Sequence, residues 1–129
     1  MPAASVVFFW NGSSAPVVEW LSDLRTKDRH GFANGIARMK LLRDEGYSLD
    51  RPACGFLGDD IYELRWKHHS VQYRILYFFH ARNTAVLAHA FVKRDSMVPK
   101  EEIKRATERK KKFDVNPRAH TLQKEIDDV

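Results

Sequence analysis

The spacing of apolar residues changes along this chain, and each change in spacing predicts the start of a new helix or strand. The run Ser5 to Trp10 is rich in valine and phenylalanine and predicts a buried strand that ends at Asn11-Gly12. Ser13 or Ser14 is placed to cap a helix, since Pro16 falls in the first turn that follows. Its apolar stripe has helical spacing and consists of Val17, Val18, Trp20, Leu21 and Leu24.

A second amphipathic segment follows directly. It begins at about Lys27 or Asp28 and runs to Glu45, where Gly46 supplies the stop. Its inward positions are Phe32, Ile36, Met39, Leu41 and Leu42. The two segments together predict a helical hairpin.

The middle of the chain has the alternating period of β-strands. After a connecting loop at 47–57, which contains a proline and a glycine, three strands are predicted at Ile61 to Trp66, Val71 to His80 and Ala85 to Lys93. A third helix is then expected from Pro99 to Lys112, with acidic residues in its first turn and lysines in its last.

A tight turn at Arg82-Asn83 would set the register of the last two strands. The predicted cross-strand pairs are Gln72 with Lys93, Arg74 with Phe91, Leu76 with His89 and Phe78 with Leu87. One face would then carry Arg74, Leu76, Phe78, Leu87, His89, Phe91 and Lys93, and the other Tyr73, Ile75, Tyr77, Phe79, Val86, Ala88, Ala90 and Val92. The second of these faces is almost wholly apolar and is expected to form the core.

Cations on the first face are unusual for a small sheet. In this register Arg74 and Lys93 are diagonal neighbours, about 7–8 Å apart, which is close enough to hold one phosphate between them. The alternative is structural: Arg74 pairs with Glu63 or Asp59, and Lys93 ends in solvent.

These elements predict an α+β fold in the order β-α-α-β-β-β-α. The sheet is expected to be antiparallel, with the helical hairpin on its apolar face and the C-terminal helix near the other. We expect one domain over residues 1–113, followed by a tail at 114–129 that is either flexible or carries a short helix at Thr121 to Ile126.

Charge and cysteine content narrow the range of binding partners and cellular compartments. With 22 basic and 17 acidic residues the net charge is +5, which favours polyanionic partners such as messenger or ribosomal RNA. Cys54 is the single cysteine, so no intrachain disulfide forms. No stretch approaches the roughly 20 apolar residues of a membrane span, so we expect a cytoplasmic protein without a membrane partner.

Four short motifs occur in order and resemble the phage-derived toxins of the HigB type, within the RelE/ParE toxin superfamily. They are Gly58-Asp59-Asp60-Ile61-Tyr62-Glu63-Leu64-Arg65, Tyr73-Arg74-Ile75-Leu76-Tyr77, His89-Ala90-Phe91-Val92-Lys93-Arg94, and Pro99 with Glu102-Ile103 and Ala106. The resemblance covers about 5–113.

The resemblance implies a RelE-like fold and the toxin of a type II toxin–antitoxin system. Such a toxin enters the ribosomal A site and cuts messenger RNA, which inhibits translation. It also implies a cognate antitoxin, usually a helix-turn-helix protein, that binds the toxin and carries the pair to operator DNA. No cofactor is implied.

The resemblance also assigns roles to particular residues. Arg74 matches the arginine that contacts the scissile phosphate, while Lys93 and Arg94 match the basic end of the next strand. Arg65 matches the Glu-Leu-Arg motif. Glu63 stands where the shorter RelE toxins carry a lysine, and this departure leaves the general base open.

RNA cleavage by its own 2′-hydroxyl needs a base, an acid and positive charge around phosphorus. Arg74, Arg65 and Lys93 suit the charge, and His89 is a candidate proton shuttle or else a buried core histidine. Lys67, His68 or His69 can replace the missing lysine as base.

Further residues are candidates for holding RNA. Trp66 is predicted at a strand end, where a base can stack on it. The RNA-binding set is Trp66, Lys67, His68, His69, Arg94, Lys110, Lys111 and Lys112. The adjacent histidines lack the spacing and partners of a metal site, so no metal is predicted.

Two further functions remain open at this stage. One is a poison of DNA gyrase, because ParE toxins share the fold but lack the RNA-cutting residues. The other is an RNA-binding module without catalysis, which the presence of Glu63 in place of a lysine favours.

Overall fold

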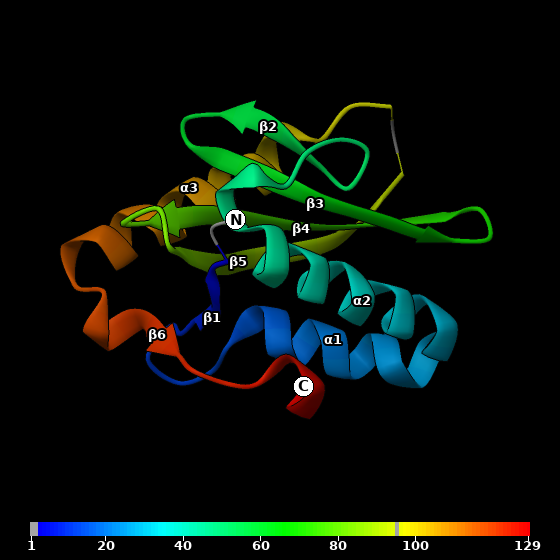
Figure 1. The fold of residues 1–129 in the computed structure, drawn as a ribbon, viewed down its shortest axis with the longest axis horizontal. Coiled ribbons are helices and arrows are strands. Elements are labelled where there is room, and N and C mark those ends of the chain that lie inside the picture. Colours follow the sequence, from blue (N-terminus) through cyan, green and yellow to red (C-terminus); the bar gives the residue numbers. More distant parts are fainter. Residues whose placement is uncertain (1–2, 95) are drawn as a thin grey trace.

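A six-stranded sheet forms the centre of the structure, with two helices against one face and one helix against the other (Figure 1). The computed structural model describes residues 3–94 and 96–129. The strands are β1 (Ser5–Phe9), β2 (Cys54–Gly58), β3 (Ile61–His68), β4 (Val71–His80), β5 (Thr84–Lys93) and β6 (Thr121–Leu122). The helices are α1 (Pro16–Lys27), α2 (Arg29–Glu45) and α3 (Lys100–Val115), and the 3₁₀ turns are Gly46–Ser48, Arg118–His120 and Ile126–Asp128.

The predicted α+β class is confirmed, but the order of elements differs in part. The strands lie in the order β2-β3-β4-β5-β1-β6, with β1 parallel to β5 and the other neighbours antiparallel. Strand β2 occupies Cys54–Gly58, where the sequence predicted a loop. In the sequence Gly55 favours a loop, but in the structure it pairs with Glu63 in the β2·β3 ladder.

The helical hairpin begins and ends with recognisable caps, although not all are those expected. The predicted serine cap of α1 is wrong: the N-cap is Ala15, and Ser13 and Ser14 donate backbone N–H groups to the Asn11 side chain instead. The Asp28 carboxylate caps α2 by accepting from the Gly31 N–H at 2.9 Å. Gly46 ends α2 with a φ of 58°, as the sequence indicated.

The hairpin and α3 bury different sets of side chains. Against the hairpin lie Phe8, Leu64, Trp66, Tyr73, Ile75, Tyr77 and Leu87, packed on Val17, Leu21, Leu24, Met39 and Leu42. Against α3 lie Val7, Phe9, Ile61, Leu76, Phe78, Val86, Ala88 and Phe91, packed on Ala106 and Phe113. Leu41, predicted to point inward, is 38% exposed.

The predicted β4·β5 register is correct from Gln72 to Leu76 and wrong from Tyr77 onward. Arg74 faces Phe91 and Leu76 faces His89 as predicted, but Tyr77, not Phe78, faces Leu87. Ala88 is therefore an extra residue on β5, a β-bulge that reverses the side-chain alternation beyond it. Leu87 thus joins the hairpin core, while Val86 and Ala88 join the α3 core.

The turn that closes this hairpin also lies one residue earlier than expected. Ala81 and Arg82 both have positive φ, at 53° and 63°, so the left-handed pair is not Arg82-Asn83. Strand β5 accordingly begins at Thr84.

The C-terminal segment returns to the sheet. Thr121 and Leu122 pair with β1 in place of the short helix considered at 121–126. Ile126 and Val129 are buried against the helical hairpin. No helix in the described residues has the length and apolar content needed to cross a membrane.

Candidate active site

One buried carboxylate joins two arginines on the α3 side of the sheet. Glu63 is 2% exposed, and its Oε1 accepts from the Nε atoms of both Arg65 and Arg74, each at 2.9 Å. Arg74 is 6% exposed, whereas the Arg65 side chain keeps a third of its surface in solvent. We call these three residues the Arg-Glu-Arg cluster.

Strand register brings the cluster together. Glu63 and Arg65 alternate onto one face of β3, and Arg65 stands directly opposite Arg74 on β4. Across the β2·β3 ladder, Gly55 leaves room that a side chain would fill, since a Cβ there would overlap the Arg65 guanidinium. The arginine therefore folds over β2 toward Glu63.

The other two nitrogens of Arg74 each donate one hydrogen bond as well. Its Nη1 donates to the Tyr73 carbonyl and its Nη2 to Gln72 Oε1, each at 2.9 Å. Burial lowers the pKa of Arg74, and the Glu63 carboxylate acts in the opposite direction. Arg74 is therefore paired with Glu63, which is the structural alternative that the sequence analysis gives to a phosphate-binding role.

Lys93 lies next to this network. It faces Gln72 across β4·β5 and is half-buried at the end of its strand, while Arg94 beyond it is exposed. Gln72 therefore stands between Lys93 and Arg74. The structure brings together Arg65, Arg74 and Lys93 of the predicted catalytic set, and of these Arg65 and Lys93 offer a surface to solvent.

His89, the fourth predicted catalytic residue, links β5 to α3. It is 8% exposed, with Nε2 at 2.7 Å from Glu102 Oε1 and Nδ1 at 3.2 Å from Arg109 Nη1. A guanidinium can only donate, so Nδ1 accepts and Nε2 carries the proton toward Glu102. Burial lowers the His89 pKa despite that carboxylate. Both ring nitrogens are occupied, which fits the core-histidine reading.

Trp66 does not occupy the exposed strand end predicted for it. Strand β3 continues to His68, and the Trp66 ring is 4% exposed, stacked on Tyr73 with its Nε1 donating to the Gly31 carbonyl at 2.9 Å. A base cannot stack on a ring covered in this way. The placement of Trp66 as an RNA platform is therefore corrected.

The two adjacent histidines lie at the far side of the sheet from Arg74. His68 alternates onto the helical-hairpin face, where its Nδ1 is 3.0 Å from Asp28 Oδ1, and its ring is 4.1 Å from that of His69. Lys67 alternates onto the same face as Arg65 and is exposed. Of these three candidates for the base, only Lys67 shares the face of the Arg-Glu-Arg cluster.

The lysines at the end of α3 differ from one another. Lys110 pairs with Asp114 at 2.8 Å and lies over the Phe78 ring, while Lys111 and Lys112 are exposed. No group of three or more histidine, cysteine or acidic side chains in the described part of the chain could hold a metal ion.

Glu63 is the functional candidate that sequence reasoning missed. The sequence contained one signal for it, since an acidic residue lay among apolar neighbours in a strand with an arginine two positions later. The sequence predicts Glu63 as a departure from the lysine-bearing toxins and as a possible partner of Arg74, but not as a partner of Arg65. Gly55 was missed because its contact with Arg65 depends on strand β2, and Gln72 was expected only as the partner of Lys93, not as an acceptor for Arg74.

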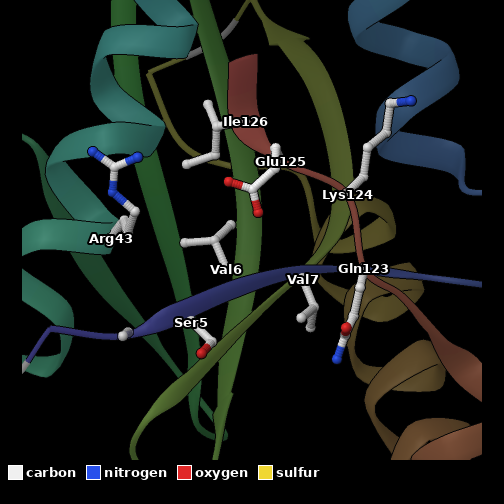
Figure 2. Close-up of a pocket in the computed structure, with 9 residues that line it drawn as sticks. Ser5, Val6, Val7, Arg43, Gln123, Lys124, Glu125 and Ile126 are labelled. Carbon is white, nitrogen blue, oxygen red and sulfur yellow. The ribbon is translucent and has the colours of Figure 1, made fainter. Parts of the chain in front are cut away.

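A separate hollow of about 330 Å³ lies at the opposite margin of the sheet, between β1 and the C-terminal segment (Figure 2). The chain leaves the β1·β6 ladder after Leu122, and Gln123 to Ile126 then form one wall. Arg43 stands across from that wall. None of the cluster residues lines this hollow.

Comparison with protein families gives a match that covers most of the chain. A family model described as phage derived protein Gp49-like (DUF891) matches residues 19–111, a span that runs from α1 into α3 and contains all three residues of the Arg-Glu-Arg cluster. It leaves out β1 and the C-terminal segment. No curated protein matches the chain.

Proposed function

The chain belongs to the Gp49-like family of phage-derived proteins, a toxin-like family, and from this premise we propose that it is the toxin of a type II toxin–antitoxin system. The sequence resemblance supports the narrower assignment to the HigB type of the RelE/ParE superfamily. The proposed activity is ribosome-dependent cleavage of messenger RNA, which stops translation.

The Arg-Glu-Arg cluster is the observation that carries this proposal. The cluster holds two guanidinium groups on the face that also carries Lys67, so it combines an exposed candidate base with the positive charge that a pentavalent phosphorus centre requires. Both arginines stay charged at neutral pH.

The chemistry can be written from these groups. Lys67, the exposed candidate base on this face, removes the proton from the 2′-hydroxyl, whose oxygen attacks the adjacent phosphorus while the bond from phosphorus to the 5′ oxygen breaks. Arg65 stabilises the charge on the phosphate oxygens, and Lys93 supplies a proton to the departing 5′ oxygen. The products are a 2′,3′-cyclic phosphate and a free 5′-hydroxyl, so no water nucleophile is needed.

Exposure assigns different tasks to the two arginines. A phosphate approaching from solvent meets Arg65 first, since Arg74 is almost fully buried. Arg74 then acts through Glu63, which it holds in place at 2.9 Å. Arg94, Lys67, Lys111 and Lys112 would add salt-sensitive contacts to RNA phosphates.

The proposed partners follow from the same family assignment. They are the ribosome with its messenger RNA, and a cognate antitoxin that brings the pair to operator DNA. The cytoplasm is the compartment in which these partners occur.

A second candidate function is supported by the burial of Glu63 and Arg74. If the cluster only stabilises the sheet, the fold remains but the RNA chemistry is lost, as in a ParE-like gyrase poison or a non-catalytic RNA-binding module. The candidates predict different inhibited processes: translation for the ribonuclease and DNA supercoiling for the gyrase poison.

Parallel assays of translation and of DNA supercoiling separate these candidates. We expect the purified protein to halt protein synthesis in a cell-free system while gyrase continues to supercoil plasmid DNA at its normal rate. Arg65→Ala should lose the effect, and Arg118→Ala, which removes an exposed cation outside the cluster, should keep it. Inhibited supercoiling with continued translation would instead favour the gyrase poison.

A further inference from the structure

Strand β2 has no neighbouring strand on its outer side within the described residues, where the Cys54 N–H donates to the Asp50 carbonyl. It is the first strand in the sheet order, and β3 is its only neighbour among the described residues (Figure 1). The Arg65 N–H donates to the Ala53 carbonyl, which sets the phase of the ladder. Gly55 then bonds toward β3, while the N–H and C=O of Phe56 point outward. No backbone partner for Phe56 occurs within residues 3–94 and 96–129.

The same residue exposes a large aromatic ring. Phe56 is 60% exposed, and its ring lies 5.0 Å from that of Tyr62. Tyr47, itself 45% exposed, lies 6.2 Å from Tyr62 and carries the Arg82 guanidinium 4.5 Å above its ring. Exposed Tyr, Phe and Arg side chains gathered in one place are typical of protein interfaces.

We propose that two copies of this chain associate through β2, edge to edge and antiparallel, about a twofold axis that passes between their two Phe56 residues. An antiparallel pair centred on a residue whose N–H and C=O both face outward is self-complementary, because each copy donates one bond and accepts one. The two sheets become one continuous sheet. The paired Phe56 rings cover each other on the helical-hairpin side.

Charge at the two ends of β2 favours this arrangement. The edge is acidic at its end, where Asp59 and Asp60 form the exposed turn into β3, and its start carries the exposed cation Arg51 next to Asp50. Antiparallel pairing about Phe56 brings the acidic end of one copy beside Arg51 of the other. A parallel pairing would place like charges together.

The interface and the Arg-Glu-Arg cluster lie on different sides of the sheet but share strand β2. Phe56 faces Tyr62 on the hairpin side, whereas Arg65 lies over Gly55 on the α3 side. Dimerisation would therefore cover the Phe56 rings on the hairpin side and place the second copy beside Arg65. An exposed strand edge with an aromatic residue is otherwise an aggregation hazard, and pairing it removes that hazard.

Sedimentation velocity over a concentration series tests the proposal with the full chain. We expect the wild type to move from monomer to dimer as concentration rises. Phe56→Lys should raise the dissociation constant at least about tenfold, since it removes the ring and sets two ammonium groups against each other on the axis. Val115→Lys is the matched control, because Val115 is 86% exposed on α3 and lies away from β2.

Hydrogen exchange at the Phe56 amide supplies a second readout. Its N–H should exchange rapidly in dilute wild type and slowly at concentrations where the dimer forms. Arg51→Glu should weaken association by removing the charge complement while leaving Phe56 unchanged. A wild type that stays monomeric throughout, or a dimer that Phe56→Lys leaves intact, would overturn the proposal.

Discussion

At the scale of single residues, Glu63 has the largest effect on its surroundings. It neutralises two cations from a site that is almost closed to water, so its removal would leave the buried guanidinium of Arg74 without a counter-charge. Arg65 is different, because solvent screens a third of its side chain. The two members of the cluster should therefore respond differently to mutation.

We expect Glu63→Ala to lower the free energy of unfolding by about 3–5 kcal/mol, the cost of leaving a buried charge unpaired. Arg65→Ala should cost about 1 kcal/mol or less, since its pair is partly exposed. Urea denaturation of both variants measures the difference. Equal losses would contradict the burial assigned to Arg74 and Glu63.

The pH dependence of stability should report His89. Burial lowers its pKa in the folded state below the unfolded value of 6.5, so the unfolded chain binds the proton more readily. The stability that neutral His89 contributes is present above pH 6.5 and is lost as the pH falls below it. Urea unfolding at a series of pH values should show this loss in wild type.

His89→Gln serves as the comparison for this titration. Glutamine lacks a titrating group, so the decline of stability just below pH 6.5 should flatten. Asp28, whose pKa is lowered by its hydrogen bonds from Tyr73 and Gly31, contributes a separate loss only below its ordinary value of 3.8. An unchanged slope near pH 6 in His89→Gln would exclude His89 as its source.

At the scale of elements, α2 lies close against the sheet because Gly35 faces the Trp66 ring on β3 and Gly31 faces the Tyr73 ring on β4. A Cβ on Gly35 would lie 2.7 Å from Trp66 Cζ2, and Trp66 Nε1 donates to the Gly31 carbonyl one turn earlier. The hydrogen bond and the close approach fix the helix over the strand.

The substitution Gly35→Ala tests this helix–strand contact, because the contact decides whether the melting temperature falls or rises. In an open helix alanine is more favourable than glycine by about 1 kcal/mol. Here we expect the opposite, a lower melting temperature in thermal denaturation, because the added methyl group meets the buried indole ring. A raised melting temperature would show that α2 can move away from Trp66.

The sequence predicted those elements whose signals are local. Asp28 and Gly46 marked both ends of α2, and the Arg74–Phe91 pair followed from simple alternation. The Ala88 bulge and strand β2 were not predictable in the same way. A bulge adds one residue without a marker in the sequence, and β2 depends on Gly55 admitting the Arg65 side chain from a neighbouring strand.

The candidate site was predicted in part for the same reason. Arg65, Arg74 and Lys93 were recognised from their residue types and order, and the structure places them near one another. The pairing of Glu63 with both arginines needed the β3·β4 register, and the covering of Trp66 needed the position of α2. These contacts join elements that are distant in the sequence, so the pattern of residue types alone could not predict them.

At the scale of the whole molecule, the sheet separates two surfaces with different tasks. The α3 side carries the Arg-Glu-Arg cluster, and the hairpin side together with the β2 edge carries the exposed aromatic rings. The net charge of +5 favours approach to RNA from any direction, but only the first surface offers a base beside a guanidinium. The account therefore depends on whether that surface cuts RNA.

Primer extension on a defined messenger RNA, free and loaded on ribosomes, tests this claim most directly. We expect cleavage only on ribosomes, by wild type and Arg118→Ala, with Arg65→Ala slower by about a hundredfold, as for loss of one group that stabilises transition-state charge. Circular dichroism would establish that each variant is folded. Intact messages with folded wild type, or equal cleavage by Arg65→Ala, would contradict the account.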